Sequence, residues 1–367
     1  MQGGAVANMG HAMSLVSGDY NTAFGEPGAL GLRKERTAPR TARVRDNWAD
    51  SAPVARPTVV TMTANAAWAD AQPVLSVLTP FLGDDPSGLL KAIQIQAARL
   101  SAPVEIIALD DGTGDEALAR RVDAAVGALA MPAAFVRLSQ NEGRSAARNR
   151  LAQVARGRHL LYLDADTVPD RADFLAAYVE MIEANDPPLA IGGFSLIQAS
   201  HEPRYDLHRA IAIQLDCMPV AVRQVTPWRF VYGSNILVRR DVMQATPFNP
   251  DYRAWGWEDQ EWGMRVADRW PILHVDNTVS HLGLDTVPTL LEKYASSGAN
   301  FHRILADHPD RVKDYPAYRA AKTLSGLPFK PMFRALARQA ALNEALPLTA
   351  RAFALRLFRV LNYLASH

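Results

Sequence analysis

The chain has 367 residues, of which 49% are hydrophobic and 21% are charged, and its formal net charge is +1. This length allows one large domain or two small ones, and the near-neutral charge excludes a general attraction to nucleic acid. The single cysteine excludes an intramolecular disulfide framework and fits a reducing compartment.

Residues 1–70 show no sustained hydrophobic period, and we predict that they form a disordered leader. They are rich in Ala, Gly, Pro and Thr and carry a basic cluster between Arg33 and Arg45. The first 20 residues lack the basic and apolar regions of a secretory signal, and no stretch approaches the ~18 apolar residues of a membrane span. We therefore expect a cytoplasmic protein.

Short apolar runs alternate with segments of helical spacing from residue 73 onward. The runs are apolar on both faces, which is typical of a parallel sheet covered by helices. The pattern predicts an α/β fold with a mixed, mostly parallel sheet flanked by helices. Strands are expected at 73–81, 104–112, 133–139 and 159–166, and helices at 89–100, 115–129, 143–156 and 170–184.

The alternation loosens after residue 188, where a mixed, aromatic-bearing segment reads as an insertion. One or two amphipathic helices are expected in the last 40 residues. We divide the chain into the leader (1–70), an α/β domain (71–310) and C-terminal amphipathic helices (311–367). In the second half, strands are expected at 189–197, 230–240, 272–276 and 278–282, the insertion at 199–229, and helices at 258–269 and 286–305.

The last predicted helix is amphipathic and basic, and two interpretations of it remain open. It can lie on an anionic membrane surface, which would place the protein peripherally at the inner face of the membrane, or it can dock on the domain. Its apolar face comprises Phe353, Leu357, Val360, Leu361 and Leu364, and the arginines of the C-terminal region are Arg334, Arg338, Arg351, Arg356 and Arg359.

Polar residues collect where the predicted strands end. In an open α/β sheet, ligands bind at the carboxyl edge of the strands. Buried carboxylates at such an edge need partners, and a divalent cation is one. The residues in question are Thr79-Pro80 at the end of the first strand, Asp110-Asp111 at the end of the second, Asn141-Glu142-Gly143-Arg144 near the end of the third and Asp164-Ala165-Asp166 at the end of the fourth.

Asp164 and Asp166 lie two residues apart at the end of an apolar strand. On an extended chain such residues point the same way, so both carboxylates can face one hard cation. Mg²⁺ or Mn²⁺ suits two carboxylates combined with substrate phosphates. The alternative is that both aspartates only cap the helix that follows.

Gly143 opens a helix that carries Arg144 and Arg148 four residues apart. A helix N-terminus with arginine side chains suits a pyrophosphate group. Surface arginines on a solvated helix face are the alternative.

Glu258 and Asp259 form a carboxylate pair flanked by Trp255 and Trp257. Aromatic faces suit the CH faces of a sugar, and a carboxylate beside apolar rings has a raised pKa, which is useful to a general base. The competing interpretation is a helix start with a Trp-rich core. His281, in the TVSHLG segment after this carboxylate pair, is a candidate third metal ligand. His274 is an isolated histidine on an apolar strand, which is more typical of a core histidine with its hydrogen bonds satisfied.

Taken together, VLTPF, ALDDGT, NEGRSAARN, LYLDADTVP and WGWEDQEWGMR resemble a family 2 glycosyltransferase of the GT-A fold over roughly residues 73–285. The last piece also resembles the acceptor-side motif of galactosyltransferases and chondroitin polymerases. The resemblance implies nucleoside binding by Thr79, Pro80, Asp110 and Asp111, and a position near the nucleotide for Arg148. It further implies ribose and metal binding by Asp164 and Asp166, a catalytic base at Asp259, and a sugar contact at Glu258.

The resulting hypothesis is an inverting, metal-dependent hexosyl- or N-acetylhexosaminyltransferase. Its donor would be a nucleotide-sugar, in the first place a UDP-sugar, and its acceptor a glycan or lipid-linked hydroxyl in polysaccharide or glycoconjugate synthesis. The Q-x-x-R-W motif of processive synthases is absent from the chain. Two alternatives remain: a non-catalytic nucleotide- or sugar-binding module, and a nucleotidyltransferase, which usually carries a Gly-rich N-terminal loop that this chain lacks.

Overall fold

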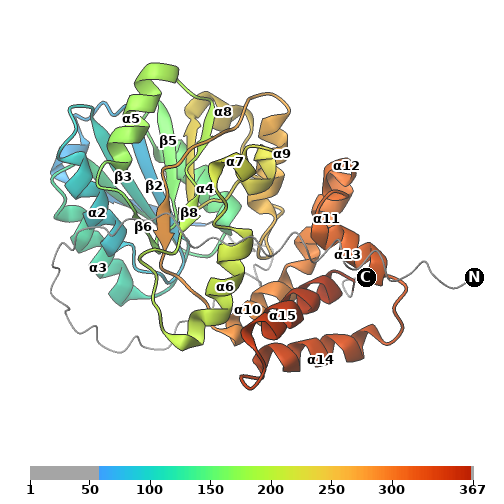
Figure 1. Ribbon diagram of the computed structural model, residues 1–367. Helices are drawn as coiled ribbons and strands as arrows, with labels where there is room; N and C mark the ends of the chain where they lie inside the picture. Colours follow the sequence, from blue (N-terminus) through green and yellow to red (C-terminus); the bar gives the residue numbers. More distant parts are fainter. Residues whose placement is uncertain (1–57, 365–367) are drawn as a thin grey trace, which may run out of the picture. The chain divides into compact units, whose positions relative to one another are not determined.

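The computed structural model describes residues 58–364 (Figure 1). Residues 1–57 of the predicted leader lie outside the described residues. Its last part contains strand β1 (Val60–Ala64), which pairs antiparallel with the edge of the main sheet. All five β1 residues are exposed, although Val, Met and Ala alternate with Thr along the strand. The strand is therefore positioned by backbone pairing with β4 and not by burial of an apolar face.

The main sheet has eight strands and is mixed but mostly parallel at its centre. The four strands predicted first in the chain lie side by side and run parallel, while β9 inserts antiparallel between β5 and β7. In spatial order the strands are β1 (Val60–Ala64), β4 (Ala133–Leu138), β3 (Val104–Asp110), β2 (Leu75–Phe81), β5 (His159–Leu163), β9 (Asn235–Arg239), β7 (Leu189–Ile191) and β10 (Leu273–His274).

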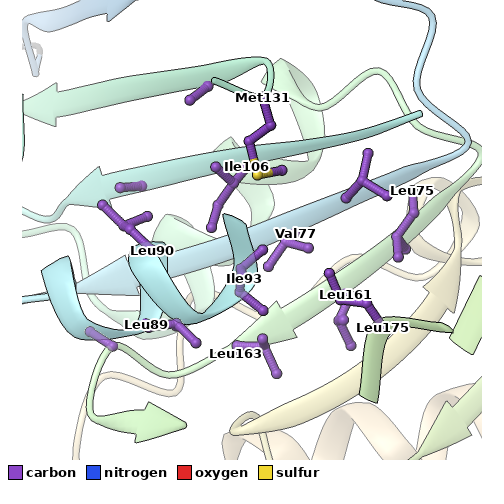
Figure 2. Close-up of a cluster of buried hydrophobic side chains, with 14 of the residues drawn as sticks. Leu75, Val77, Leu89, Leu90, Ile93, Ile106, Met131, Leu161, Leu163 and Leu175 are labelled. Carbon is purple, nitrogen blue, oxygen red and sulfur yellow. The ribbon is translucent and has the colours of Figure 1, made fainter. Parts of the chain in front are cut away.

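Helices cover both faces of this sheet, which confirms the predicted fold class. One apolar core joins the sheet to α2 (Ser87–Ala97), α3 (Glu116–Gly127) and α5 (Phe174–Asn185). Figure 2 shows this core around Val77, Ile93 and Leu161. The second core, on the opposite face, joins the sheet to α4 (Arg144–Val154), α8 (Arg240–Ala245) and α9 (Glu258–Ala267). Strands β2 and β3 are buried along their whole length, as their apolar sequences predict.

A second, three-stranded sheet follows the end of β5. Its strands are β6 (Thr167–Pro169), β11 (Val279–His281) and β8 (Phe194–Ser195). In the antiparallel pairing of β11 with β6, His281 lies opposite Thr167. The small sheet therefore brings His281 next to the aspartates that follow β5.

The predicted insertion at 199–229 is largely helical, and the predicted helix at 286–305 is two helices, α10 and α11. The hydroxyls of Ser296 and Ser297 donate to carbonyls of the preceding turn, and Gly298 follows. Such side-chain bonds compete with regular helix bonding. The remaining helices are 3-10 helices η2 (Ala66–Trp68), η3 (Pro203–Tyr205) and η4 (Pro227–Phe230), and α6 (Asp206–Leu215), α7 (Val220–Arg223), α10 (Val287–Ser296), α11 (Gly298–Asp307), α12 (Pro309–Val312), α13 (Pro316–Leu324), α14 (Lys330–Leu342) and α15 (Leu348–Tyr363).

Two further apolar clusters attach the C-terminal helices to the rest of the described chain. One joins α6, α10, α14 and α15 through side chains such as Leu207, Leu290 and Leu355. The other joins Tyr363 of α15 to Trp257 and Phe301. Within residues 58–364 no helix is both long and apolar enough to span a bilayer.

Candidate active site

The loops at the carboxyl ends of β3 and β4 are tied together by Asp111. Its two carboxylate oxygens accept the backbone N–H groups of Glu142 at 2.8 Å and Gly143 at 3.0 Å. Gly112 has φ +76°, and a Cβ there would lie 2.3 Å from the carbonyl carbon of Gln140. Only glycine permits this approach. The predicted convergence of the strand ends is thus confirmed for β3 and β4.

The four predicted nucleoside-binding residues lie on the paired strands β2 and β3 or directly after them. Thr79 and Pro80 are buried inside β2, and among the described residues Thr79 Oγ1 has no hydrogen-bond partner. Asp110 accepts the N–H of Thr113 at 2.9 Å and lies 3.9 Å from Arg137 Nε. Burial raises the pKa of Asp111 to about 7 and outweighs the opposing effect of its two backbone hydrogen bonds.

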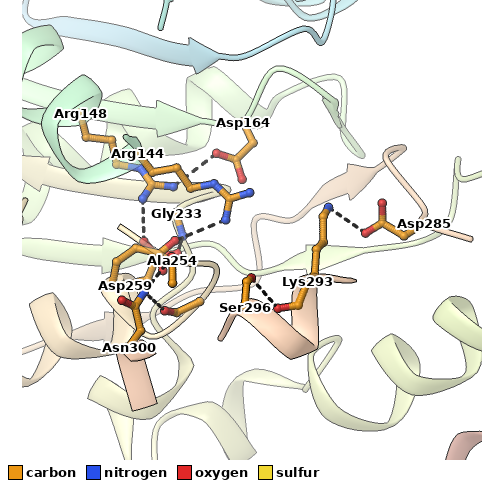
Figure 3. A network of polar contacts seen from close by, with 12 residues as sticks. Arg144, Arg148, Asp164, Gly233, Ala254, Asp259, Asp285, Lys293, Ser296 and Asn300 are labelled. Carbon is orange, nitrogen blue, oxygen red and sulfur yellow. Dashed lines mark hydrogen bonds and ion pairs between the residues drawn. The ribbon is translucent and has the colours of Figure 1, made fainter. Parts of the chain in front are cut away.

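Arg148 joins two carboxylates that are 95 residues apart in the sequence (Figure 3). Its Nη1 donates to Asp259 Oδ1 at 2.8 Å, and its Nη2 lies 3.5 Å from Asp164 Oδ1. The other oxygen of Asp259 accepts the N–H of Gly233 at 2.7 Å. A Cβ at Gly233 would lie 1.8 Å from Arg148 Nη2, so glycine leaves the space that the guanidinium fills. Only 3% of the Arg148 side chain is exposed.

Glu258 completes this group of charges at the first turn of α9. Its Oε1 lies 3.5 Å from Arg144 Nη1, and its Oε2 is buried without a hydrogen-bond partner among the described residues. Burial, and then the neighbouring Asp259 carboxylate, raise the pKa of Glu258. We call Arg144, Arg148, Asp164, Glu258 and Asp259 the arginine–carboxylate network.

The segment before Glu258 has an unusual backbone. Gly256 has φ +81° and Trp257 φ +77°, so two successive residues lie in the left-handed region. For a bulky residue this conformation is strained by about 1–3 kcal/mol and persists only where its surroundings hold it. The side chain of Asn300 on α11 donates to the carbonyls of Ala254 and Gly256, both at 2.7 Å. These two bonds hold the segment in place.

The two tryptophans predicted to meet a sugar have different surroundings. Trp257 is 5% exposed and its ring packs against Phe301, Tyr315 and Tyr363. For Trp257 the structure therefore favours the Trp-rich core interpretation. Trp255 is partly exposed beside Tyr294, so it is the ring of the pair that can present a face to a ligand.

Asp166 and His281 face each other, with His281 Nε2 3.3 Å from Asp166 Oδ2. Burial alone would lower the pKa of His281, but the Asp166 carboxylate outweighs it and raises the pKa to about 9. A Cβ at Gly283 would lie 1.6 Å from Asp166 Oδ2, so the glycine provides the space for this carboxylate. Within residues 58–364, no group of three or more His, Cys, Asp or Glu side chains is arranged to hold a metal ion by itself. The oxygen and nitrogen donors present fit a site that a diphosphate completes.

Sequence reasoning missed three residues of this region. Gly233 and Asn300 act through a backbone N–H and an amide on elements without a recognised motif. His208, on α6, accepts the N–H of Asp285 and its ring centroid lies 6.2 Å from that of His281. Of the three, only Gly233, the glycine of the YGSN segment, could have been noticed in the sequence as a position of close backbone approach. His274, by contrast, is a satisfied core histidine, as expected: it contacts Arg223 Nη1 at 2.8 Å and the carbonyl of Pro227 at 2.9 Å.

Residues 76–246 match the family model described as Glycosyl transferase family 2. The comparison with curated proteins gave no match. Among solved structures, the mannosyltransferase PcManGT from Pyrobaculum calidifontis, in complex with GDP-Man and Mn²⁺, has a TM-score of 0.49 and 15% identity. That match covers 82% of this chain and 88% of the other.

Two more solved structures are similar at the same level. TarS 1–349 of S. aureus in complex with UDP has a TM-score of 0.44 and 15% identity, covering 78% of this chain and 90% of the other. GalNAc-T7 with UDP, GalNAc and Mn²⁺ has a TM-score of 0.45 and 17% identity, covering 76% and 52%. The family match covers somewhat less than half of the chain, includes the strand ends from Thr79 to Asp166, and supports a glycosyltransferase.

Proposed function

We propose that this protein is an inverting, metal-dependent glycosyltransferase that moves a sugar from a nucleotide-sugar to an acceptor hydroxyl. The observation that carries the proposal is the arginine–carboxylate network. It brings Asp164, from a strand end inside the family match, together with Glu258 and Asp259, which lie beyond it. A purely structural sheet has no need of three carboxylates around two arginines at its carboxyl edge.

The donor is proposed to be a UDP-sugar, with its nucleoside at the ends of β2 and β3. Thr79, Pro80, Asp110 and Asp111 lie on these strands or directly after them, and Thr79 Oγ1 has a free hydrogen-bonding capacity among the described residues. Arg148 is proposed to lie near the diphosphate, because its positive charge suits a phosphate group and it lies beside Asp164, a proposed ligand of the metal.

Asp164, Asp166 and His281 are the proposed ligands of Mn²⁺ or Mg²⁺. A divalent cation bound there would supply positive charge against the diphosphate leaving group. Asp166 and His281 already face each other, and Asp164 precedes Asp166 by two residues. The diphosphate oxygens would provide the remaining ligands.

Asp259 is the proposed general base. It would accept the proton of the acceptor hydroxyl while that oxygen bonds to the anomeric carbon and the bond from this carbon to the diphosphate breaks. A single displacement inverts the anomeric configuration. Each Asp259 oxygen accepts one hydrogen bond, Oδ1 from Arg148 and Oδ2 from Gly233, and each keeps a second lone pair that can accept the proton. Oε2 of Glu258, which has no hydrogen-bond partner within residues 58–364, suits a sugar hydroxyl.

The acceptor is proposed to be a hydroxyl of a glycan or lipid-linked intermediate in polysaccharide or glycoconjugate synthesis. Trp255, which is partly exposed beside Tyr294 and precedes Glu258 by three residues, is the ring proposed to contact a sugar. The transferred group is proposed to be a hexosyl or an N-acetylhexosaminyl group.

Calorimetric titration with UDP, GDP, ADP and CDP, each with and without Mn²⁺, tests the donor site. We expect UDP to bind only with the metal, and Asp166→Ala to weaken that binding by at least about tenfold. Asp259→Asn should keep UDP binding within about twofold while transfer falls by about 10²–10⁴-fold. Asp173→Asn, on an exposed carboxylate, is the matched control.

Three results would contradict these assignments. If no nucleotide binds the wild-type protein, the donor-site assignment is wrong. If UDP binds but no UDP-sugar is turned over, a non-catalytic binding module is the better description. Full transfer activity in Asp259→Asn would show that another residue is the general base. Glu258→Gln would then be the next variant to measure.

A further inference from the structure

Helix α14 carries an exposed apolar stripe on its outer face. Phe329, which directly precedes the helix, is 74% exposed, Met332 is 51% exposed and Leu336 is 57% exposed. Their spacing of three and four residues places them along one side of the helix. We call these three residues the α14 stripe.

The other side of α14 is buried, so the stripe is not a sign of a poorly packed helix. Ala337 and Ala341 pack in the apolar cluster that α14 shares with α10 and α15. In Figure 1, α15 lies between α14 and α10, and α14 is the outermost of the three. The helix is therefore fixed in position, with its apolar stripe facing away from the core.

Basic side chains form a separate row on α14, because at about 100° per residue Arg334 lies roughly 160° around the helix from Leu336. The helix contains Lys330, Arg334 and Arg338 and no acidic residue. Within the described part of the chain these three side chains form no ion pair. Residues 315–364 hold eight Lys or Arg and a single acidic residue, Glu344, although the whole chain has a net charge of only +1.

We propose that the exposed half of α14, with the α14 stripe along one edge and the basic row along the other, docks on an anionic membrane surface. Phe, Met and Leu side chains can insert at the boundary between headgroups and acyl chains, while Lys and Arg remain among the anionic headgroups. The positive charge of this surface favours an anionic membrane as its binding partner. A second copy of the chain would bring two basic surfaces together, which like-charge repulsion opposes. This proposal is independent of the proposed function, because none of these residues belongs to the arginine–carboxylate network.

The test is cosedimentation of the full chain with vesicles of phosphatidylcholine alone and of phosphatidylcholine with about one third phosphatidylglycerol. We expect binding to the anionic vesicles only, and weaker binding at high salt. The double variant Met332→Glu/Leu336→Glu and the triple variant Lys330→Gln/Arg334→Gln/Arg338→Gln should each weaken it by roughly tenfold or more.

Ile95→Glu is the matched control, because Ile95 is 49% exposed on α2, outside this surface. We expect it to bind vesicles like the wild type. Thermal unfolding and UDP titration of every variant separate a folding defect, or a failure of the donor site, from a loss of membrane binding.

Two results would overturn the proposal. One is that the wild-type protein does not bind anionic vesicles, or that both α14 variants bind them as strongly as the wild type does. The other is a concentration-dependent dimer that Met332→Glu/Leu336→Glu dissociates, which would make the stripe a contact between two copies of the chain.

Discussion

The chemistry of the candidate site depends on single side chains whose charges are buried together. Burial of Arg148 would by itself lower the pKa of its guanidinium, but the carboxylates of Asp259 and Asp164 outweigh this and hold the pKa above its usual value. The arginine therefore keeps its charge in a largely dry environment. Removing either carboxylate would leave that charge less compensated, which is why variants of the network need a stability measurement beside the activity assay.

Asp111 should make the stability of the protein depend on pH. Its pKa is raised to about 7, so between about pH 4 and 7 the folded state binds a proton that the unfolded state has lost. Its contribution to stability is fully present below about pH 4 and is lost as the pH rises through 7. Relative to Asp111→Asn, the wild type should lose up to about 1.4 kcal/mol of unfolding free energy per pH unit in this window.

Urea unfolding of both proteins at pH 5, 6 and 7 measures this difference. Asp310→Asn, at a fully solvated position, controls for the removal of a carboxylate. Parallel pH profiles for the wild type and Asp111→Asn would show that the two backbone hydrogen bonds, and not burial, govern this carboxyl group.

At the scale of elements, the carboxylate pair depends on a loop that another helix holds. Trp257, whose backbone is strained, directly precedes Glu258, and α11 holds its segment through Asn300. Loop, α9 and α11 therefore act together in positioning Glu258 and Asp259, although the loop and both helices follow the residues that match the family model.

Asn300→Ala should loosen this loop without touching the donor site. Two buried hydrogen bonds are lost, each contributing about 1 kcal/mol, so we expect transfer to slow about tenfold or more while UDP binding stays within about twofold. Amide hydrogen exchange of residues 254–259 should become faster. Asn362→Ala is the control, because Asn362 is also buried but donates within its own helix, to Phe358. Equal effects of the two variants on transfer would exclude a positioning role for Asn300.

At the scale of the whole described chain, the C-terminal helices are part of the folded unit. Helix α15 packs against α6, α10 and α14 through one apolar cluster, and its Tyr363 stacks on Phe301 with ring centroids 4.1 Å apart. The guanidinium of Arg359 also lies over the rings of Trp255 and Trp257, at 5.7 Å and 5.8 Å. The last helix thus packs against the segment that precedes Glu258 and Asp259.

A truncation after Leu327 should unfold or strongly destabilise the protein. It would expose Leu207, Leu290 and Leu291, and each buried side chain of this size contributes about 1.5–3 kcal/mol, against a total stability of about 5–15 kcal/mol. We expect an insoluble chain or a Tm lowered by more than about 10 °C in circular dichroism. Removal of residues 365–367 alone is the control. An unchanged Tm after the longer truncation would show that the helices are a detachable tail.

The sequence by itself determined the parallel centre of the sheet and the strand ends that carry its polar residues. Apolar runs such as those of β2 and β3 predict buried strands because both of their faces must avoid water. The crossover rule for parallel strands then brings their carboxyl ends to one edge, so Asp110, Asp111 and Asp164 could be grouped in advance.

Only the tertiary structure decided which of these groups touch. The pairing of Arg148 with Asp259 joins residues 111 positions apart, and no local period records such a distance. The same holds for the burial of Trp257, whose ring packs against α11 and α15, and for β1, whose exposed residues pair with β4 and whose Thr63 hydroxyl donates to Asp123. Local patterns report burial along a segment, whereas contacts between segments depend on how the whole chain packs.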